Sequence, residues 1–435
     1  MATSEQQAAS EPDTASRPMW RYMRRLFRAG GMFSSLRIHD FRILWFGMLF
    51  AMAAMQMNMV ARSWLAYDIT GSGVAIGLVA LSMGVPRFIA GPFAGAAADR
   101  FDKRGLLIVT QLIRAAMALA IAALITFGLI EIWHMMVIGV FQGLTSSLMM
   151  PARTAYISDL VSEGELPNAI ALDSTGRNLN RIIAPAVAGV MIWLSPAIVF
   201  YVIAGLYLLG IYTVLRLPDA RPDGAQVDGV LRGATRGIAY FWEQKSLLLL
   251  LGLAITLVVF GMPYRNLLPI FQKDVFDVGP SALGLMYTAV GAGAIVASLL
   301  VAYLADSPRL QLMQLIAGVS FGLALALFAL SGSYILGLAL LAAVGFASQV
   351  FLTINKTLLM LASDRAYYGR VMSIYMMGFS LTPIALLPMG AAVDAVGAPV
   401  TVAAAGAVVV AVITTTGAIQ GVRRRGSDAL LVPSR

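Results

Sequence analysis

The sequence predicts an all-α polytopic membrane protein with twelve transmembrane helices, arranged as two pseudo-symmetric six-helix halves. Hydrophobic residues make up 59% of the 435 residues and charged residues only 12%, whereas soluble domains are about half apolar and a quarter charged. The apolar residues form successive runs of about 20, the length that crosses roughly 30 Å of hydrocarbon. In addition, the second six runs repeat features of the first six.

Two sets of six apolar runs, separated by a polar stretch, give the expected spans. The first set covers residues 43–66, 74–98, 105–129, 133–159, 166–194 and 197–216. The second set covers residues 246–272, 281–305, 310–331, 334–361, 371–393 and 398–421. The expected organisation is an N-terminal basic segment (1–42), a first half (43–216), a linker (217–245), a second half (246–421) and a tail (422–435).

The basic residues indicate how the chain is oriented in the membrane. With alternating spans, 22 of the 31 Lys and Arg residues fall on one side, one falls on the other side and eight lie within spans. Because Lys and Arg mark cytoplasmic loops, we expect both termini and the linker to face the cytoplasm. The net charge of +9 therefore reflects membrane topology and does not indicate nucleic-acid binding.

The composition and motifs also argue against several kinds of site. The chain has no cysteine and only two histidines, His39 and His134, both near expected helix ends. Disulfides, thiolate catalysis and a histidine- or cysteine-based metal site are therefore not expected. No phosphate-binding loop occurs, so we expect neither a cofactor nor ATP-driven pumping by this chain.

An internal repeat relates the two halves. At an offset of 207 residues, small residues of the second span recur in the eighth, and Asp99 at the end of one corresponds to Asp306 at the end of the other. At an offset of 203 residues, Arg153 in the fourth span corresponds to Lys356 in the tenth. Two such halves around a midplane site are the construction of many secondary transporters.

The loop between the second and third spans carries a signature. In the segment GAAADRFDKRG, a glycine is followed four residues later by Asp-Arg and then by basic residues, which are Gly95, Asp99, Arg100, Lys103 and Arg104. Together with the span count, the short connections and the repeat over residues 40–420, this pattern resembles the major facilitator superfamily. The resemblance implies a monomeric secondary active transporter that works by alternating access.

The signature residues are expected to form a conformational latch. Gly95 permits close contact with a neighbouring helix, and Asp99 is expected to accept hydrogen bonds from the exposed amides at another helix N-terminus. The resemblance implies helix eleven, which starts near Arg370, as that partner. Arg100 is expected to pair with Asp159 at the end of helix four. The alternative is a loop that only follows the positive-inside rule.

Further stretches resemble bacterial exporters of the enterobactin-exporter and drug-efflux type, which implies the bacterial inner membrane. They are WLAYDITGSGVAIGL (64–78), MPAR (150–153) and ELPNAIALDS (165–174). In helix five, Pro185 and Gly189 are similar to the proline-glycine signature of drug/proton antiporters. Helix four departs from the pattern, since Gly139 occupies the position where many proton-coupled relatives carry arginine. This departure argues against direct proton coupling through helix four.

The eight cations inside spans need a reason, because a charge at mid-bilayer costs about 2.5–3.5 kcal/mol on insertion scales. In helix one, a stripe with helical spacing contains Met55, Met59 and Arg62, and Asn58 lies beside it. Arg265 takes a similar depth in helix seven. We expect the two arginines to hold an anionic group of a substrate bidentately and the methionines to supply apolar contact. Alternatively, the arginines extend to the outer interface and the methionines pack against other helices.

Helix five carries a second polar stripe, which cannot face lipid. Asp173, Arg177 and Arg181 follow at i,i+4 spacing, and Asn180 lies on the same face. Asp173 and Arg177 are expected to neutralise each other. Arg181 then remains as a pathway-lining charge or as part of a structural network with Asn178 or Asn180. Asp173, with Arg177 as its partner, is the interior candidate for proton coupling.

Three functions are compatible with these features. The first is an exporter of an amphipathic, anionic small molecule, siderophore-like or drug-like, with coupling to a proton gradient as an option. The second is a lipid or lysophospholipid flippase on the same fold, which would use the interior cations on a phosphate. The third is a non-transporting membrane receptor or enzyme. No nucleic-acid partner is expected; the expected partners are a small-molecule substrate and membrane lipids.

Overall fold

The computed structural model describes residues 33–429, except for 220–243, 305–306, 308 and 365–366. For residues 92–100, 151 and 420–429 only the backbone is described. Most of the N-terminal basic segment, most of the linker and the last six residues of the tail therefore lie outside the described residues. Within the described part, the secondary structure is helical throughout, as expected for a chain whose backbone polar groups must be satisfied inside a bilayer.

The first half contains six long helices after a short 3-10 turn, η1 (Ser34–Arg37). These helices are α2 (His39–Thr70), α3 (Gly73–Arg100), α4 (Lys103–Thr126), α5 (Ile132–Leu160), α6 (Leu166–Leu194) and α7 (Pro196–Val214). All but α6 are long and apolar enough to cross a membrane. The exception, α6, is the helix that carries Asp173, Arg177 and Arg181, and it packs inside the bundle between α2, α7 and α11.

The second half repeats the pattern with two interrupted helices. The seventh span consists of α9 (Lys245–Thr256), the π-helical turn η2 (Leu257–Gly261), α10 (Tyr264–Ile270) and a second π-helical turn, η3 (Phe271–Val275). It is followed by α11 (Pro280–Tyr303), α12 (Leu310–Leu330) and α13 (Tyr334–Leu361). The eleventh span consists of α14 (Tyr368–Gly378), the 3-10 turn η5 (Phe379–Leu381) and α15 (Thr382–Val396). The twelfth span is α16 (Ala398–Ala429).

The expected spans and fold class are confirmed, with differences at the ends. Spans five and ten begin and end at the residues expected from the sequence, 166–194 and 334–361. The largest difference is α16, which continues to Ala429 instead of ending at residue 421. Its last turns contain arginines, and a helix is free to run on past the hydrocarbon because its backbone hydrogen bonds are all internal.

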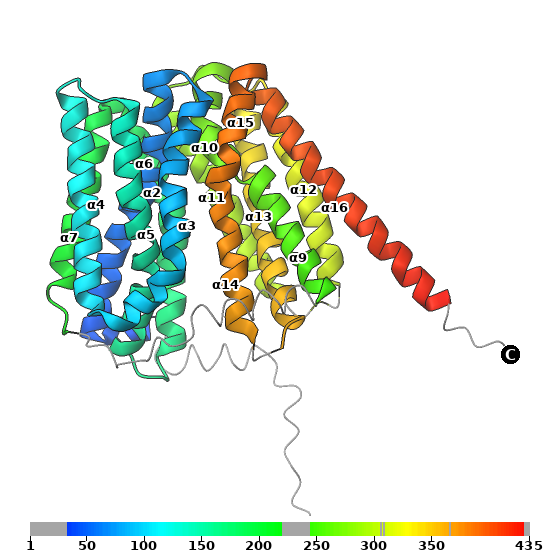
Figure 1. Cartoon of the computed structure of the whole chain (residues 1–435), viewed down its shortest axis with the longest axis horizontal. Helices are drawn as coiled ribbons and strands as arrows, with labels where there is room; N and C mark the ends of the chain where they lie inside the picture. Colours follow the sequence, from blue (N-terminus) through cyan, green and yellow to red (C-terminus); the bar gives the residue numbers. More distant parts are fainter. Residues whose placement is uncertain (1–32, 220–243, 305–306, 308, 365–366, 430–435) are drawn as a thin grey trace, which may run out of the picture.

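The spans form two bundles that lie side by side (Figure 1), and three helix pairs make most of the contacts between them. The first bundle is built on α3 against α5 and α4 against α7, and the second on α11 against α13 and α12 against α16. Between the bundles, α6 packs on α11, α3 on α15, and α2 on α10. The end at which α2 begins, α7 ends and α9 begins is called the linker end below, and the opposite end is called the turn end.

Glycines allow the helices of the two halves to touch backbone to backbone. A Cβ atom at Gly284 of α11 would lie 2.6 Å from the carbonyl oxygen of Pro185 in α6, and a Cβ at Gly189 would lie 2.8 Å from the amide nitrogen of Gly284. Pro185 and Gly189 of α6, the fifth span, therefore lie where α6 of the first half crosses α11 of the second half. Small residues permit such close crossings in membrane proteins.

Candidate functional site

Arg62 is buried inside the first half. Its guanidinium donates to the side-chain oxygen of Gln142 at 2.6 Å and to the carbonyl oxygen of Met135 at 3.1 Å, both in α5. The amide of Asn58 donates to the same Gln142 oxygen at 3.0 Å. Arg62 is only 5% exposed, so this side chain joins α2 to α5 and does not extend to the outer interface.

Gly139 provides the space that this arginine occupies. A Cβ atom at Gly139 would lie 3.0 Å from Nη2 of Arg62 and 2.1 Å from the hydroxyl of Ser82. Gly139 leaves space on α5, the fourth span, and the guanidinium of Arg62 from α2, the first span, fills that space. The sequence shows both residues, but it does not show that they meet.

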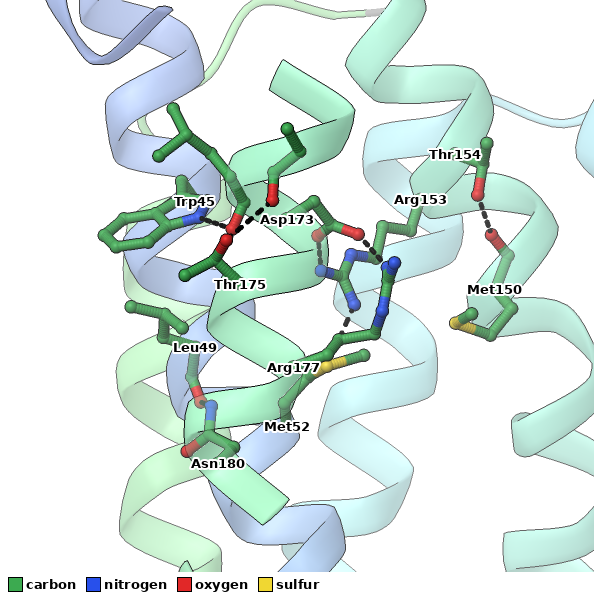
Figure 2. A network of polar contacts seen from close by, with 12 residues as sticks. Trp45, Leu49, Met52, Met150, Arg153, Thr154, Asp173, Thr175, Arg177 and Asn180 are labelled. Atoms are coloured by element: carbon green, nitrogen blue, oxygen red, sulfur yellow. Dashed lines mark hydrogen bonds and ion pairs between the residues drawn. The ribbon is translucent and has the colours of Figure 1, made fainter. Parts of the chain in front are cut away.

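A buried charge cluster ties α5 to α6 (Figure 2). The carboxylate of Asp173 forms ion pairs with Arg153 of α5 and with Arg177, one turn along α6. The side chains of Arg153 and Asp173 are 3% and 8% exposed, whereas that of Arg177 is 32% exposed. The expected Asp173–Arg177 pair is thus present. Arg153 is a further partner of Asp173, and no pattern in the sequence identifies it.

Arg181 and Arg265, one from each half, are near enough for their positive charges to interact. Arg181, in the middle of α6, lies close enough to Arg265 of α10 and to Arg177 for their positive charges to act on it. Its side chain is exposed although α6 packs inside the bundle. Among the described carboxylates, none forms an ion pair with Arg181 or Arg265. The guanidinium of Arg265 lies beside the hydroxyl of Tyr264.

The other residues expected at the substrate site, Asn180, Met55 and Met59, make different contacts within the first half. The amide of Asn180 donates to the carbonyl oxygen of Leu49 at 3.2 Å and so fastens α6 to α2. Met55 and Met59 are partly buried and pack against different core clusters. Met52, one turn before Met55 and Gln56, lies against the guanidinium of Arg153.

The loop signature is described only in part. The side chains of Asp99 and Arg100 lie outside the described residues, and only the backbone of Gly95 is described. Asp159 accepts from Lys103 at 2.6 Å, so a signature cation does pair with the carboxylate at the end of helix four.

Arg104, the last cation of the signature, closes the end of α7. Its side chain donates to the backbone carbonyl oxygens of Val214 and Leu215 at 3.2 and 2.6 Å and pairs with Asp219. These carbonyls belong to the last turn of a helix, where no internal donor is available. The signature loop is therefore fixed to both α5 and α7.

A group of polar contacts at the turn end was not expected from the sequence. The hydroxyl of Tyr67 donates to Asp274, and Lys273 pairs with Asp68 at 3.3 Å. Asp394 of α15 accepts hydrogen bonds from the start of α3. These contacts join the first half to the second, and the only sequence signal for them is that charged residues lie at matching span ends.

Within the described residues, no group of three or more His, Asp or Glu side chains is arranged to hold a metal ion. Away from the turn end, the described polar side chains between the halves include the guanidinium groups of Arg181 and Arg265, the amide of Asn266 and the hydroxyls of Ser63 and Thr288. Such groups bind and orient a solute, and guanidinium pairs favour carboxylate or phosphate.

Comparison with known proteins gives consistent matches. The chain matches the family model described as transmembrane secretion effector over residues 30–428. Macrolide efflux protein A of Streptococcus pyogenes is 22% identical over 365 residues, which cover 82% of this chain and 90% of that protein. Enterobactin exporter EntS of Shigella flexneri is 24% identical over 337 residues, 76% of each chain. The solved nucleoside transporter NupG has a similar fold, with a TM-score of 0.74 at 14% identity, over 87% of this chain and 99% of that chain.

Proposed function

Because the chain belongs to the transmembrane secretion effector family of the major facilitator superfamily, we propose that it exports an amphipathic, anionic small molecule from the cytoplasm. The expected superfamily and its exporter branch are confirmed by these matches. The family and the relatives are transporters and not enzymes, so the receptor or enzyme alternative is set aside. The nature of the substrate is the proposal, and the interior arginines support it.

The proposed mechanism is alternating access of the two halves around the space between them. With the linker end on the cytoplasmic side, as the basic residues predict, the halves are closed toward the outside. Between described residues, the hydrogen bonds and ion pairs that cross from one half to the other involve residues in the middle of the helices or at the turn end. The contacts that close the turn end support an inward-facing state, which would receive substrate from the cytoplasm.

The observation that carries the substrate class is the pair Arg181 and Arg265. One arginine comes from each half, and neither has a carboxylate partner among the described residues. Two unpaired guanidinium groups that repel each other are stabilised when a carboxylate or phosphate lies between them. A site shared by both halves is also one that a rocking motion would reshape. We therefore propose that Arg181, and not Arg62, binds the anionic group together with Arg265. The guanidinium of Arg62 already donates hydrogen bonds to Gln142 and to the carbonyl oxygen of Met135.

The proposal is tested by binding in detergent. Purified protein is screened by thermal shift against anionic siderophores, fatty acids and lysophospholipids, and against cationic and neutral drugs. Selective stabilisation by anions in the parent, lost in Arg181→Gln and in Arg265→Gln but kept in Lys356→Gln, is the expected result. Lys356→Gln is the matched control, because it removes an exposed interior cation that has no ion-pair partner among the described residues.

Three outcomes decide between the alternatives. Stabilisation by cations and not by anions would overturn the charge argument and make multidrug efflux the leading function. Stabilisation confined to lysophospholipids would favour the flippase. An anion response that survives loss of both arginines would show that the anion binds elsewhere.

A further inference from the structure

Asp394, in the last turn of α15, caps a helix that belongs to the other half. Its carboxylate accepts a hydrogen bond from the hydroxyl of Ser72 at 2.6 Å and from the backbone amides of Gly73 and Val74 at 2.5 and 3.1 Å. These groups form the N-terminus of α3, where the first amides have no partner inside the helix. A negative charge at that position also interacts favourably with the helix dipole.

A close helix crossing places the carboxylate there. A Cβ atom at Gly390 would lie 2.3 Å from the carbonyl oxygen of Gly73, and a Cβ at Gly73 would lie 2.8 Å from the carbonyl oxygen of Gly390. Further along α3, a Cβ at Gly77 would lie 2.8 Å from the Cα of Leu387. Asp394 follows Gly390 by four residues, about one helical turn, so backbone contact at the glycines brings its side chain to the start of α3.

A second set of contacts closes the same end. Tyr67 and Asp68 lie in the last turn of α2, and Lys273 and Asp274 lie in the last turn of the seventh span, its counterpart in the second half. The two pairs cross, since Tyr67 donates to Asp274 while Lys273 pairs with Asp68. Both sets of partners come from opposite halves, so they are satisfied by protein only while the halves touch at the turn end.

We propose that Asp394 is a latch at the turn end that stabilises the inward-facing state and is released when the turn end opens. In the open state, the carboxylate and the α3 amides would separate and form hydrogen bonds with water instead. The stabilisation that their charge-assisted hydrogen bonds give the closed state would then be lost. The latch thereby sets the ratio of the two states. It rests on the alternating access in the proposed function and not on the identity of the substrate.

The same two spans would then carry a latch at each end. Asp99, at the linker end of α3, is expected from the sequence to face the start of the eleventh span, and Asp394, at the turn end of that span, faces the start of α3. Each carboxylate would cap the other span's helix in one state only. Asp394 is thus the mirror of the signature aspartate, although its own loop carries no matching signature.

Distances between spin labels test the latch. The chain has no cysteine, so label pairs are introduced directly at exposed positions. Phe127→Cys with Ile335→Cys reports the turn end, and Leu215→Cys with Leu361→Cys reports the linker end; these side chains are 76%, 79%, 52% and 70% exposed. The protein is reconstituted in lipid nanodiscs, and the fractions of the short and long distances are measured at each end.

Asp394→Asn is compared with Asp277→Asn, the same change at an exposed residue of the same end that has no hydrogen-bond or ion-pair partner among the described residues. The expected result is a shift on the order of 10-fold toward the open turn end for Asp394→Asn, with a matching closure of the linker end, and no shift for Asp277→Asn. Gly390→Ala tests the same crossing without a charge change, with Gly205→Ala as its control, since a Cβ there would meet nothing within 4 Å.

Equal distance distributions for Asp394→Asn and Asp277→Asn would overturn the latch. If Asp394→Asn does not fold, the comparison of Gly390→Ala with Gly205→Ala decides, and equal distributions there would overturn it as well. Substrate transport by the unlabelled parent is measured separately, so that failure of the proposed function is seen in a different assay from failure of the latch.

Discussion

Replacing Asp173 with asparagine keeps the shape of the side chain and removes its charge. Arg153, whose side chain is 3% exposed, would then be a buried cation without a counter-charge, because Asp173 is its ion-pair partner. Breaking a buried ion pair in this way costs about 3–5 kcal/mol, since an uncompensated charge remains. The free energy of unfolding of the first half should fall by that amount.

The melting temperature provides the assay. For a unit of 150–250 residues, 1 kcal/mol corresponds to about 2–4 °C, and the first half is of this size. Asp173→Asn is therefore expected to lower the melting temperature in detergent by about 6–20 °C. The melting temperature is measured by size-exclusion chromatography of samples heated to a series of temperatures. Arg177→Gln is the matched control, because it removes an i,i+4 pair in which the arginine side chain is 32% exposed, and i,i+4 helix pairs contribute about 0.3–0.5 kcal/mol.

A double variant separates charge from packing. Replacing a buried ion pair by apolar residues of similar volume is often neutral or stabilising, so Arg153→Met combined with Asp173→Leu should recover most of the lost melting temperature. The reasoning is refuted if Asp173→Asn melts within about 2 °C of the parent, or no lower than Arg177→Gln. A stable Asp173→Asn variant would also be the protein in which to test Asp173 as a proton carrier, by transport against an imposed pH gradient.

Two further predictions concern helix packing and the signature loop. Gly143→Ala would place its Cβ 2.2 Å from the carbonyl oxygen of Met83, so it should destabilise the protein by about 1–3 kcal/mol. Gly205→Ala has open space around it and should stabilise the protein by about 0.5–1 kcal/mol. The two variants should therefore shift the melting temperature in opposite directions. Lys103→Gln removes the partly exposed pair with Asp159 and should cost only about 0.2–1 kcal/mol. If the signature loop acts as a latch, the same variant should nevertheless move the spin-label distances at the linker end, and unchanged distances there would count against that role.

Several features of the fold follow from the sequence because they depend on local chemistry. The ends of spans five and ten were predicted to the residue, since apolar runs end where polar residues begin. The interruptions in spans seven and eleven were not predicted. Pro263, Pro269 and Pro383 signal breaks in regular hydrogen bonding, but the positions of the π-helical and 3-10 turns depend on what packs beside them.

The candidate site divides in the same way. The stripe of Asp173, Arg177 and Arg181 is evident from i,i+4 spacing, and the Asp173–Arg177 pair follows from that spacing alone. That Arg153 is the second partner of Asp173 depends on how α5 is rotated against α6. Helical periodicity does not contain that rotation.

The sequence by itself determined that this protein is a membrane protein of twelve spans with repeated halves and excess positive charge inside its spans, and its signature loop resembles that of the major facilitator superfamily. Length, hydropathy and short motifs suffice for that, because the bilayer imposes the same constraint on every span. The tertiary structure decided which charges are satisfied: Arg62 by helix four, Asp173 by two arginines, and Asp394 by a helix of the opposite half. Such pairings depend on the depth, rotation and crossing of helices that are distant in the chain. Packing fixes these quantities, and local sequence does not.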